Sequence, residues 1–202
     1  MPAEAKRRRN RRGEGDLLRR QILEATTVLL AEAGDANAVS MRDIAAAAGV
    51  TPPAIYRLFA DKEALLRAVI AERFDAFDLH LEQGEAGATT VREQLEGRCR
   101  AYLDYAATHP GHYRVLFSAT HLGPVEVGAS DGGHPGAASF NRLLTAVAAC
   151  VPAGRGKAQR AFTITVELWS ALHGFADLRI TKPEFPWPAS SVFLADMLER
   201  LV

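Results

Sequence analysis

The chain has 202 residues, of which 48% are hydrophobic, and its formal net charge is zero. This length suits one compact domain, or a small domain followed by a larger one. Two cysteines, Cys99 and Cys150, are too few for a disulfide framework, and no apolar run is long enough to span a membrane. We therefore expect a cytoplasmic protein with no membrane partner, in which both cysteines pack as small hydrophobic residues.

The zero net charge hides a difference between the two ends of the chain. Residues 1–73 carry 13 basic and 10 acidic side chains, whereas residues 74–202 carry 11 and 14. Residues 1–15 contain almost no apolar side chains and hold five clustered arginines, namely Arg7, Arg8, Arg9, Arg11 and Arg12. This composition predicts a disordered basic arm over residues 1–15, which either solubilises the protein or enters the minor groove of DNA.

Three helices are predicted within residues 16–60. The first runs from residue 17 to Gly34, and the next two are short and flank Gly49, which suits the left-handed backbone of a tight turn. Ser40 and Thr51 stand at the N-cap positions of these short helices. The apolar residues on their facing sides are Ile44, Ala45, Ala48, Val50, Ile55 and Leu58. This register predicts a helix-turn-helix that binds the major groove of DNA, although two short helices of an ordinary bundle are an alternative.

Residues 17–75 resemble the N-terminal domain of TetR-type transcriptional repressors. The first helix, the helix-turn-helix and the segment 54–65 carry the resemblance, with Tyr56, Phe59 and Lys62 at the family's spacing. The resemblance implies that Tyr56 and Lys62 contact DNA phosphates.

The side chains expected to contact DNA lie in the arm, in the helix-turn-helix and at the start of the following helix. Besides the five arm arginines, they are Ser40, Arg42, Thr51, Pro53, Ala54, Tyr56, Arg57 and Lys62. Arg57 is the strongest candidate for recognition of a guanine, because a guanidinium can donate two hydrogen bonds to that base. Many members of the family have histidine where this chain has Leu58, so we expect Leu58 to serve packing alone.

The rest of the chain also reads as helices joined by glycine- and proline-containing segments. The predicted helices cover residues 61–83, 90–108, 112–121, 137–151, 157–179 and 190–202, and the glycine-rich segment 122–136 is predicted to be a loop. No strand pattern is present. We therefore expect an all-α fold of about nine helices, with the DNA-binding domain at residues 16–60 and a second helical domain at residues 61–202.

The second domain resembles the C-terminal domain of a subgroup of TetR-type proteins. The resemblance rests on Trp169, His173 and Gly174, spaced as Trp-x-x-x-His-Gly, and on the segment 109–117. It implies a homodimer whose last two helices form a four-helix bundle with those of the partner, and hence a pseudo-palindromic DNA operator. The residues expected at the dimer interface are Phe162, Val166, Leu172, Phe175, Phe193, Met197 and Leu201.

The resemblance also implies a ligand pocket among the middle helices. The candidate ligand-binding residues are Tyr102, Tyr113, Phe117, Phe140, Trp169 and His173. Each of them could instead be ordinary core packing, and His173 could lie at the subunit interface. We expect a small, largely apolar effector, whose binding releases the dimer from its operator and so relieves repression.

No pattern in the sequence favours an enzyme. There is no phosphate-binding glycine loop and no nucleophile elbow, and His109, His112 and His121 lack the spacing of a metal site. The sequence therefore predicts neither a metal nor a cofactor. The remaining alternative is a dimeric DNA-binding regulator that has no small-molecule effector.

Overall fold

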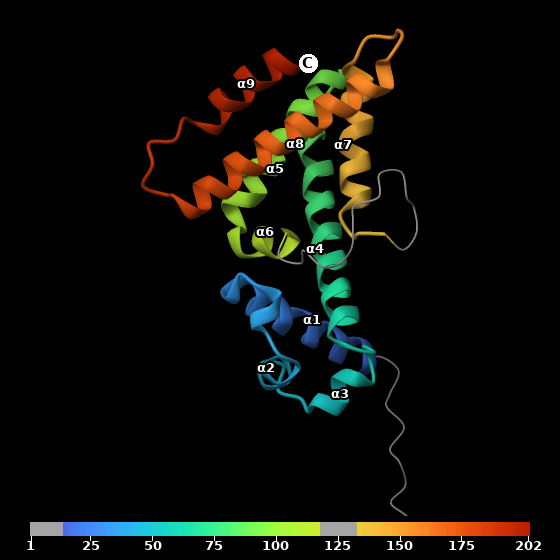
Figure 1. Ribbon diagram of the computed structural model, residues 1–202, viewed down its shortest axis with the longest axis vertical. Coiled ribbons are helices and arrows are strands. Elements are labelled where there is room, and N and C mark those ends of the chain that lie inside the picture. Colours follow the sequence, from blue (N-terminus) through green and yellow to red (C-terminus); the bar gives the residue numbers. More distant parts are fainter. Residues whose placement is uncertain (1–13, 118–132) are drawn as a thin grey trace, which may run out of the picture. The chain divides into compact units, whose positions relative to one another are not determined.

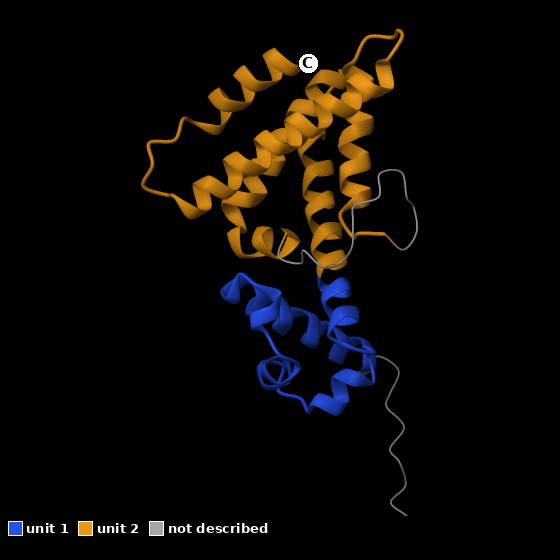
Figure 2. Cartoon of the chain, in the orientation of Figure 1, with its two compact units in different colours: residues 1–69 blue, residues 70–202 orange. Residues whose placement is uncertain are grey.

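The computed structural model describes residues 14–117 and 133–202. Within these ranges the fold consists of nine α-helices and one short 3-10 helix, without a strand (Figure 1). This confirms the all-α prediction. The chain forms two compact units, residues 1–69 and residues 70–202 (Figure 2). The five arm arginines expected to contact DNA lie outside the described residues, as does the greater part of the predicted loop 122–136.

The helices fall close to their predicted positions. Unit 1 contains α1 (Glu14–Ala33), η1 (Ala36–Ala38), α2 (Met41–Ala47) and α3 (Pro52–Tyr56). Helix α4 (Lys62–Gly84) begins in unit 1 and continues into unit 2. Unit 2 also contains α5 (Val91–Thr108), α6 (Pro110–Phe117), α7 (Ala137–Cys150), α8 (Lys157–Thr181) and α9 (Ser190–Leu201).

One predicted interruption is shorter than expected. The sequence His109-Pro110-Gly111 was expected to separate two helices, but α6 already begins at Pro110, so that only His109 lies between α5 and α6. Proline is well tolerated in the first turn of a helix, because its missing N–H has no partner there in any case. The proline therefore starts α6 and does not delay it.

The core of unit 1 is built on α1. Ile22, Leu23 and Leu30 are fully buried, and α1 packs against α2. The buried hydroxyls of Thr26 and Thr27 donate to the carbonyl oxygens of Ile22 and Leu23, at 2.7 and 2.9 Å. These bonds allow α1 to bury two polar side chains at little cost.

Helix α5 is the central element of unit 2, where it contacts α6, α7, α8 and α9. Its start lies very close to the end of α4, because a Cβ atom on Gly97 would stand 2.3 Å from the carbonyl oxygen of Gly84. Only glycine permits this approach. The described helices of both units include none that is long and apolar enough to cross a membrane.

Candidate DNA-binding and ligand-binding sites

The first helix of the predicted helix-turn-helix is held by a capping box at its N-terminus. The Ser40 hydroxyl accepts from the backbone N–H of Asp43 at 3.2 Å, and the Asp43 carboxylate accepts from the backbone N–H of Ser40 at 2.9 Å. The Ser40 hydroxyl also donates to that carboxylate, at 2.6 Å. These hydrogen bonds hold the pKa of Asp43 below its usual range. The Ser40 side chain is thus engaged in capping.

The turn after α2 has the geometry of a Schellman motif. Gly49 adopts a φ of +64°, in the left-handed region. The N–H of Val50 donates to the carbonyl oxygen of Ala45 at 2.9 Å, and the N–H of Gly49 donates to the carbonyl oxygen of Ala46 at 3.1 Å. This pair of bonds closes the helix and redirects the chain into α3.

Helix α3 presents a short polar surface. Thr51 occupies its N-cap position, but the side chain makes no capping hydrogen bond. Tyr56 is 53% exposed, and Arg42, Pro53 and Arg57 are exposed as well. These side chains can therefore reach a partner without unfolding the motif. Lys62 is half-buried at the first position of α4.

Two expectations for this surface are wrong. Ala54 was expected to be exposed but is buried, like its neighbour Ile55, so it offers little surface to DNA. Leu58 was expected to serve packing alone, yet it is 36% exposed. The reason is that α3 ends at Tyr56, so Leu58 lies beyond the helix and does not continue its buried side.

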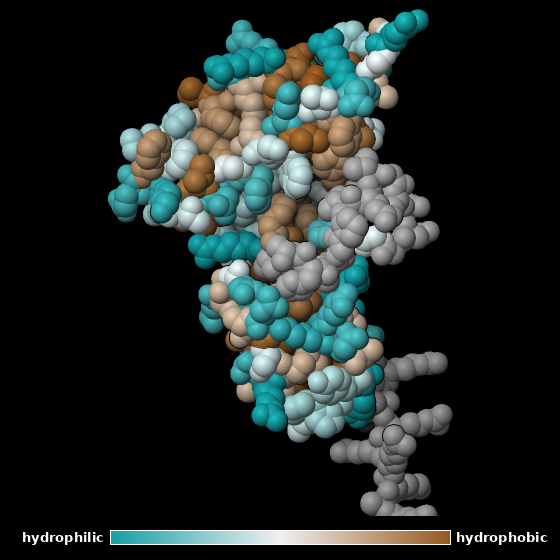
Figure 3. Space-filling view, viewed as in Figure 1, coloured by the Kyte–Doolittle hydropathy of each residue, from teal (hydrophilic) through white to brown (hydrophobic). Residues whose placement is uncertain are grey.

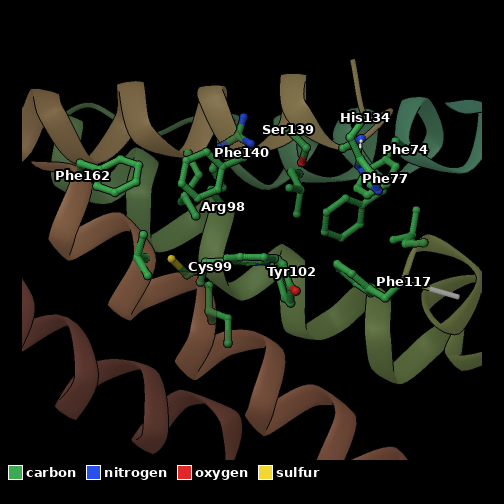
Figure 4. Close-up of a pocket in the computed structure, with 17 residues that line it drawn as sticks. Phe74, Phe77, Arg98, Cys99, Tyr102, Phe117, His134, Ser139, Phe140 and Phe162 are labelled. Carbon is green, nitrogen blue, oxygen red and sulfur yellow. Dashed lines mark hydrogen bonds between the residues drawn. The ribbon is translucent and has the colours of Figure 1, made fainter. Parts of the chain in front are cut away.

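A cavity of about 390 Å³ lies within unit 2, lined by residues of α4 to α8 and by the residues just before α7 (Figure 4). This volume is in the range of small-molecule pockets. The wall is rich in aromatic rings, contributed by Phe74, Phe77, Tyr102, Phe117, Phe140, Phe162 and Trp169. Its polar side chains are few and include Arg98, His134 and Ser139.

The rings of the wall support one another edge to face. Phe74 packs in this way against Phe77 and Phe117, with centroids 6.4 and 6.2 Å apart. Phe140 does so against Phe162 and Trp169, at 6.1 and 5.8 Å. Such contacts between aromatic rings fix the side chains that line the cavity.

Four of the six expected ligand residues line this cavity, namely Tyr102, Phe117, Phe140 and Trp169. Tyr113 and His173 are not in the wall but are linked to it by hydrogen bonds. The Tyr102 and Tyr113 hydroxyl oxygens are 3.1 Å apart, and the Tyr113 oxygen is 2.8 Å from His173 Nδ1. Burial raises the pKa of both tyrosines and lowers that of His173. The three groups are therefore kept neutral near pH 7.

A group of charged side chains borders the cavity between α4, α5 and α7. Arg98 pairs through Nε with Glu85, and Arg142 pairs with Asp78. Burial raises the pKa of Asp78, against the opposing effects of a hydrogen bond with Ser139 and of the charges of Arg142 and Arg98. Sequence reasoning missed Arg98. The signal was available, because Arg98 falls on the same helical stripe as the buried residues Leu95 and Tyr102.

Several residues expected at a dimer interface are used within the subunit. Phe162, Val166 and Leu172 line the cavity, and Leu172 is fully buried. Phe175 is buried and stacks on Phe193, with centroids 4.0 Å apart. Met197 is buried too, and Leu201 is half-buried. Leu172, Phe175 and Met197 are thus buried within the subunit, and a partner could cover almost none of their surface. The periodicity of a helix does not say which apolar side faces its own subunit.

Other apolar side chains of α8, α9 and the segment between them are exposed. They are Leu178, Phe185 at 57% exposure and Val192 at 61%. In the view of Figure 3, hydrophobic surface is interspersed with hydrophilic surface over unit 2.

The histidines near the start of α6 make local contacts. His109 Nδ1 lies 2.8 Å from the Thr108 hydroxyl, and the rings of His109 and His112 are stacked. His121 lies outside the described residues.

Two family profiles match most of the chain. The profile "Bacterial regulatory proteins, tetR family" matches residues 22–69, and "Tetracyclin repressor-like, C-terminal domain" matches residues 95–202. The matched ranges contain the helix-turn-helix and the cavity wall except for its α4 residues, Phe74, Phe77 and Leu81.

Two mycobacterial relatives have similar sequences. The transcriptional activator FasR of Mycolicibacterium smegmatis is 30% identical over 128 residues, which are 63% of this chain and 58% of FasR. The chain thus matches little more than half the length of that relative. The HTH-type transcriptional regulator Rv0681 of Mycobacterium tuberculosis is 29% identical over 92% of this chain and 80% of its own length.

Solved structures share the fold. A TetR family regulator from Marinobacter aquaeolei superposes with a TM-score of 0.69 at 20% identity, covering 94% of this chain and 97% of that one. The regulator FadR from Bacillus subtilis, solved in complex with stearoyl-CoA, superposes with a TM-score of 0.64 at 17% identity, covering 91% and 97%. The chain therefore belongs to the TetR family of DNA-binding transcription regulators, and it is not an enzyme.

Proposed function

We propose that the protein is a repressor that binds a pseudo-palindromic operator as a homodimer and leaves it when a small, largely apolar effector enters the cavity of unit 2. The proposal rests on one observation above all: the same chain holds a helix-turn-helix with exposed polar side chains and a separate aromatic cavity. Its site of action would be the cytoplasm, where the DNA is.

The roles of Tyr56 and Lys62 follow from the resemblance to the family, and that of Arg57 follows from the chemistry of its exposed guanidinium. Tyr56 and Lys62 bind phosphates, and Arg57 reads a base. Arg42 and Thr51 flank them, Pro53 contributes a nonpolar contact, and Ser40 acts by holding the start of α2. The five arm arginines add contacts in the minor groove.

The dimer is proposed to form through exposed parts of α8 and α9. Leu178 and Val192 are apolar and exposed, and Phe185 is exposed in the segment that joins α8 to α9. Phe193 and Leu201 are partly exposed and can contribute at the edge. A two-fold dimer would present two copies of α3 to two related half-sites.

Binding to DNA is tested with variants of α3 on two duplexes, one selected from random DNA by the protein and one scrambled. Arg57→Ala should weaken binding to the selected duplex about tenfold and leave the scrambled one almost unchanged. Tyr56→Ala should weaken both. Arg160→Ala, on α8, also removes one positive charge and should change the affinity for neither duplex. Equal losses of affinity for both duplexes in Arg57→Ala would contradict the proposed role of Arg57 in base recognition.

Control by an effector separates this proposal from that of a regulator without one. A panel of small apolar compounds is screened for release of the selected duplex, and active compounds are retested on Val166→Phe, which narrows the cavity. Release from the wild type that is lost in the variant supports the proposal. A panel without effect favours the regulator that has no effector. The name of the relative FasR raises activation as the second candidate, which a promoter–reporter assay separates from repression.

A further inference from the structure

One arginine lies in the wall of a cavity that is otherwise mainly apolar. Arg98 is 5% exposed and projects from α5 beside Cys99, which also lines the cavity (Figure 4). Arginine is almost never buried this far unless its charge is paired and its N–H groups have acceptors. Each N–H group of Arg98 is therefore expected to have a hydrogen-bond acceptor within the protein.

The hydrogen bonds of Arg98 are incomplete. Its Nε donates to the Glu85 carboxylate, whereas Nη1 is buried without a hydrogen-bond partner among the residues that the structure describes. A guanidinium only donates, so Nη1 needs an acceptor. Because Nη1 has no bond to give up, an acceptor that reached it from the cavity would add a hydrogen bond while the bond from Nε to Glu85 stays in place.

The charges around Arg98 do not favour an anion as that acceptor. Glu85 already neutralises Arg98, and Asp78 adds a second carboxylate close enough to interact with it. The positive charge of Arg142 is shared between Asp78 and Glu82, whose oxygen lies 3.9 Å from it. The group therefore has no net positive charge, and a ligand carboxylate would be repelled by two acidic side chains while gaining one donor.

We propose that the cavity binds an apolar molecule that carries one uncharged hydrogen-bond acceptor, a carbonyl oxygen, and that Arg98 donates to this oxygen. The aromatic rings of the wall hold the apolar body. The inference rests on the proposed function only in taking this cavity as the effector site.

Three probes of nearly equal shape separate the possibilities. 2-Acetylnaphthalene carries a neutral carbonyl, 2-ethylnaphthalene replaces that carbonyl by CH2, and 2-naphthoate carries a carboxylate. Their binding to the full chain is measured by equilibrium dialysis at pH 7.5. We expect the ketone to bind at least about tenfold more tightly than the hydrocarbon, and more tightly than the carboxylate.

Variants assign this preference to the arginine. Arg98→Met should abolish the preference for the ketone over the hydrocarbon, whereas Arg92→Met, on the exposed side of the same helix, should keep it. Glu85→Gln leaves Arg98 in place and removes one negative charge, so it should raise the affinity for 2-naphthoate several-fold. Thermal unfolding of each variant shows whether it is folded. If Arg98→Met does not fold, Glu85→Gln still tests the proposal.

The possible outcomes each decide the inference. Equal binding of ketone and hydrocarbon by the wild type, or a preference that survives Arg98→Met in a folded protein, overturns it. Tightest binding of 2-naphthoate by the wild type overturns it as well. Failure of all three probes to bind overturns the cavity as a ligand site. A clear preference for the ketone without any release of DNA supports the inference and contradicts only the effector role.

Discussion

At the scale of single residues, the DNA-binding surface of unit 1 and the cavity of unit 2 each depend on few side chains. Among the residues that the structure describes, Arg57 is the one exposed arginine at the end of α3, and Arg98 is the one arginine in the cavity wall. Tyr56 is open to a partner, whereas Tyr102 and Tyr113 are buried and bonded to each other. Residues of one type thus have opposite roles, and burial together with hydrogen bonding decides between them.

The neutral state of His173 makes stability depend on pH. Burial lowers its pKa below 6.5, although the charge of Asp177 acts in the opposite direction. As the pH falls through 6.5, the unfolded chain takes up a proton that the folded chain resists, so the free energy of unfolding decreases. His173→Asn retains an acceptor for Tyr113 and should lose less stability between pH 7.5 and pH 5.5. Urea titrations at both pH values measure this, and equal losses in both proteins would contradict it.

At the scale of elements, the close approach of α4 and α5 leaves no room for a side chain at Gly97. A Cβ on Gly97 would meet backbone atoms of Gly84, which cannot move without shifting a helix. Gly97→Ala should therefore lower the free energy of unfolding by about 1–3 kcal/mol, despite the better helix propensity of alanine. Gly15→Ala, in α1, places its Cβ in open space and is the control. Thermal or urea unfolding compares them, and equal stability of both variants would exclude the predicted clash.

Local sequence signals predicted the elements well and their partners less well. The capping box at Ser40 and the turn at Gly49 are short-range features, so the helix-turn-helix could be placed correctly. Which side of α8 faces the cavity depends on packing with α5 and α7, which helical periodicity does not contain. The sequence therefore could not predict that Leu172 lines the cavity. Arg98 was missed because a buried arginine runs against the usual preference of its residue type.

At the scale of the whole molecule, the two units carry different structural features. Unit 1 has the caps, the turn and the exposed polar side chains that suit DNA, and unit 2 has a cavity that suits a small molecule. An effector can change the affinity for DNA only if it binds the DNA-free form more tightly than the DNA-bound form. Helix α4 belongs to both units and contributes Phe74 and Phe77 to the cavity wall, so it is the element through which we expect the coupling to pass.

The most direct measurement is to sequence the DNA that the protein retains from a random pool. A homodimer with two copies of α3 should enrich one motif with two half-sites related by two-fold symmetry. The Arg57→Ala variant should retain DNA with a base preference relaxed at one position of each half-site. Retention of the pool without enrichment of any motif, or of a motif with a single half-site, would contradict a dimeric reader of DNA sequence.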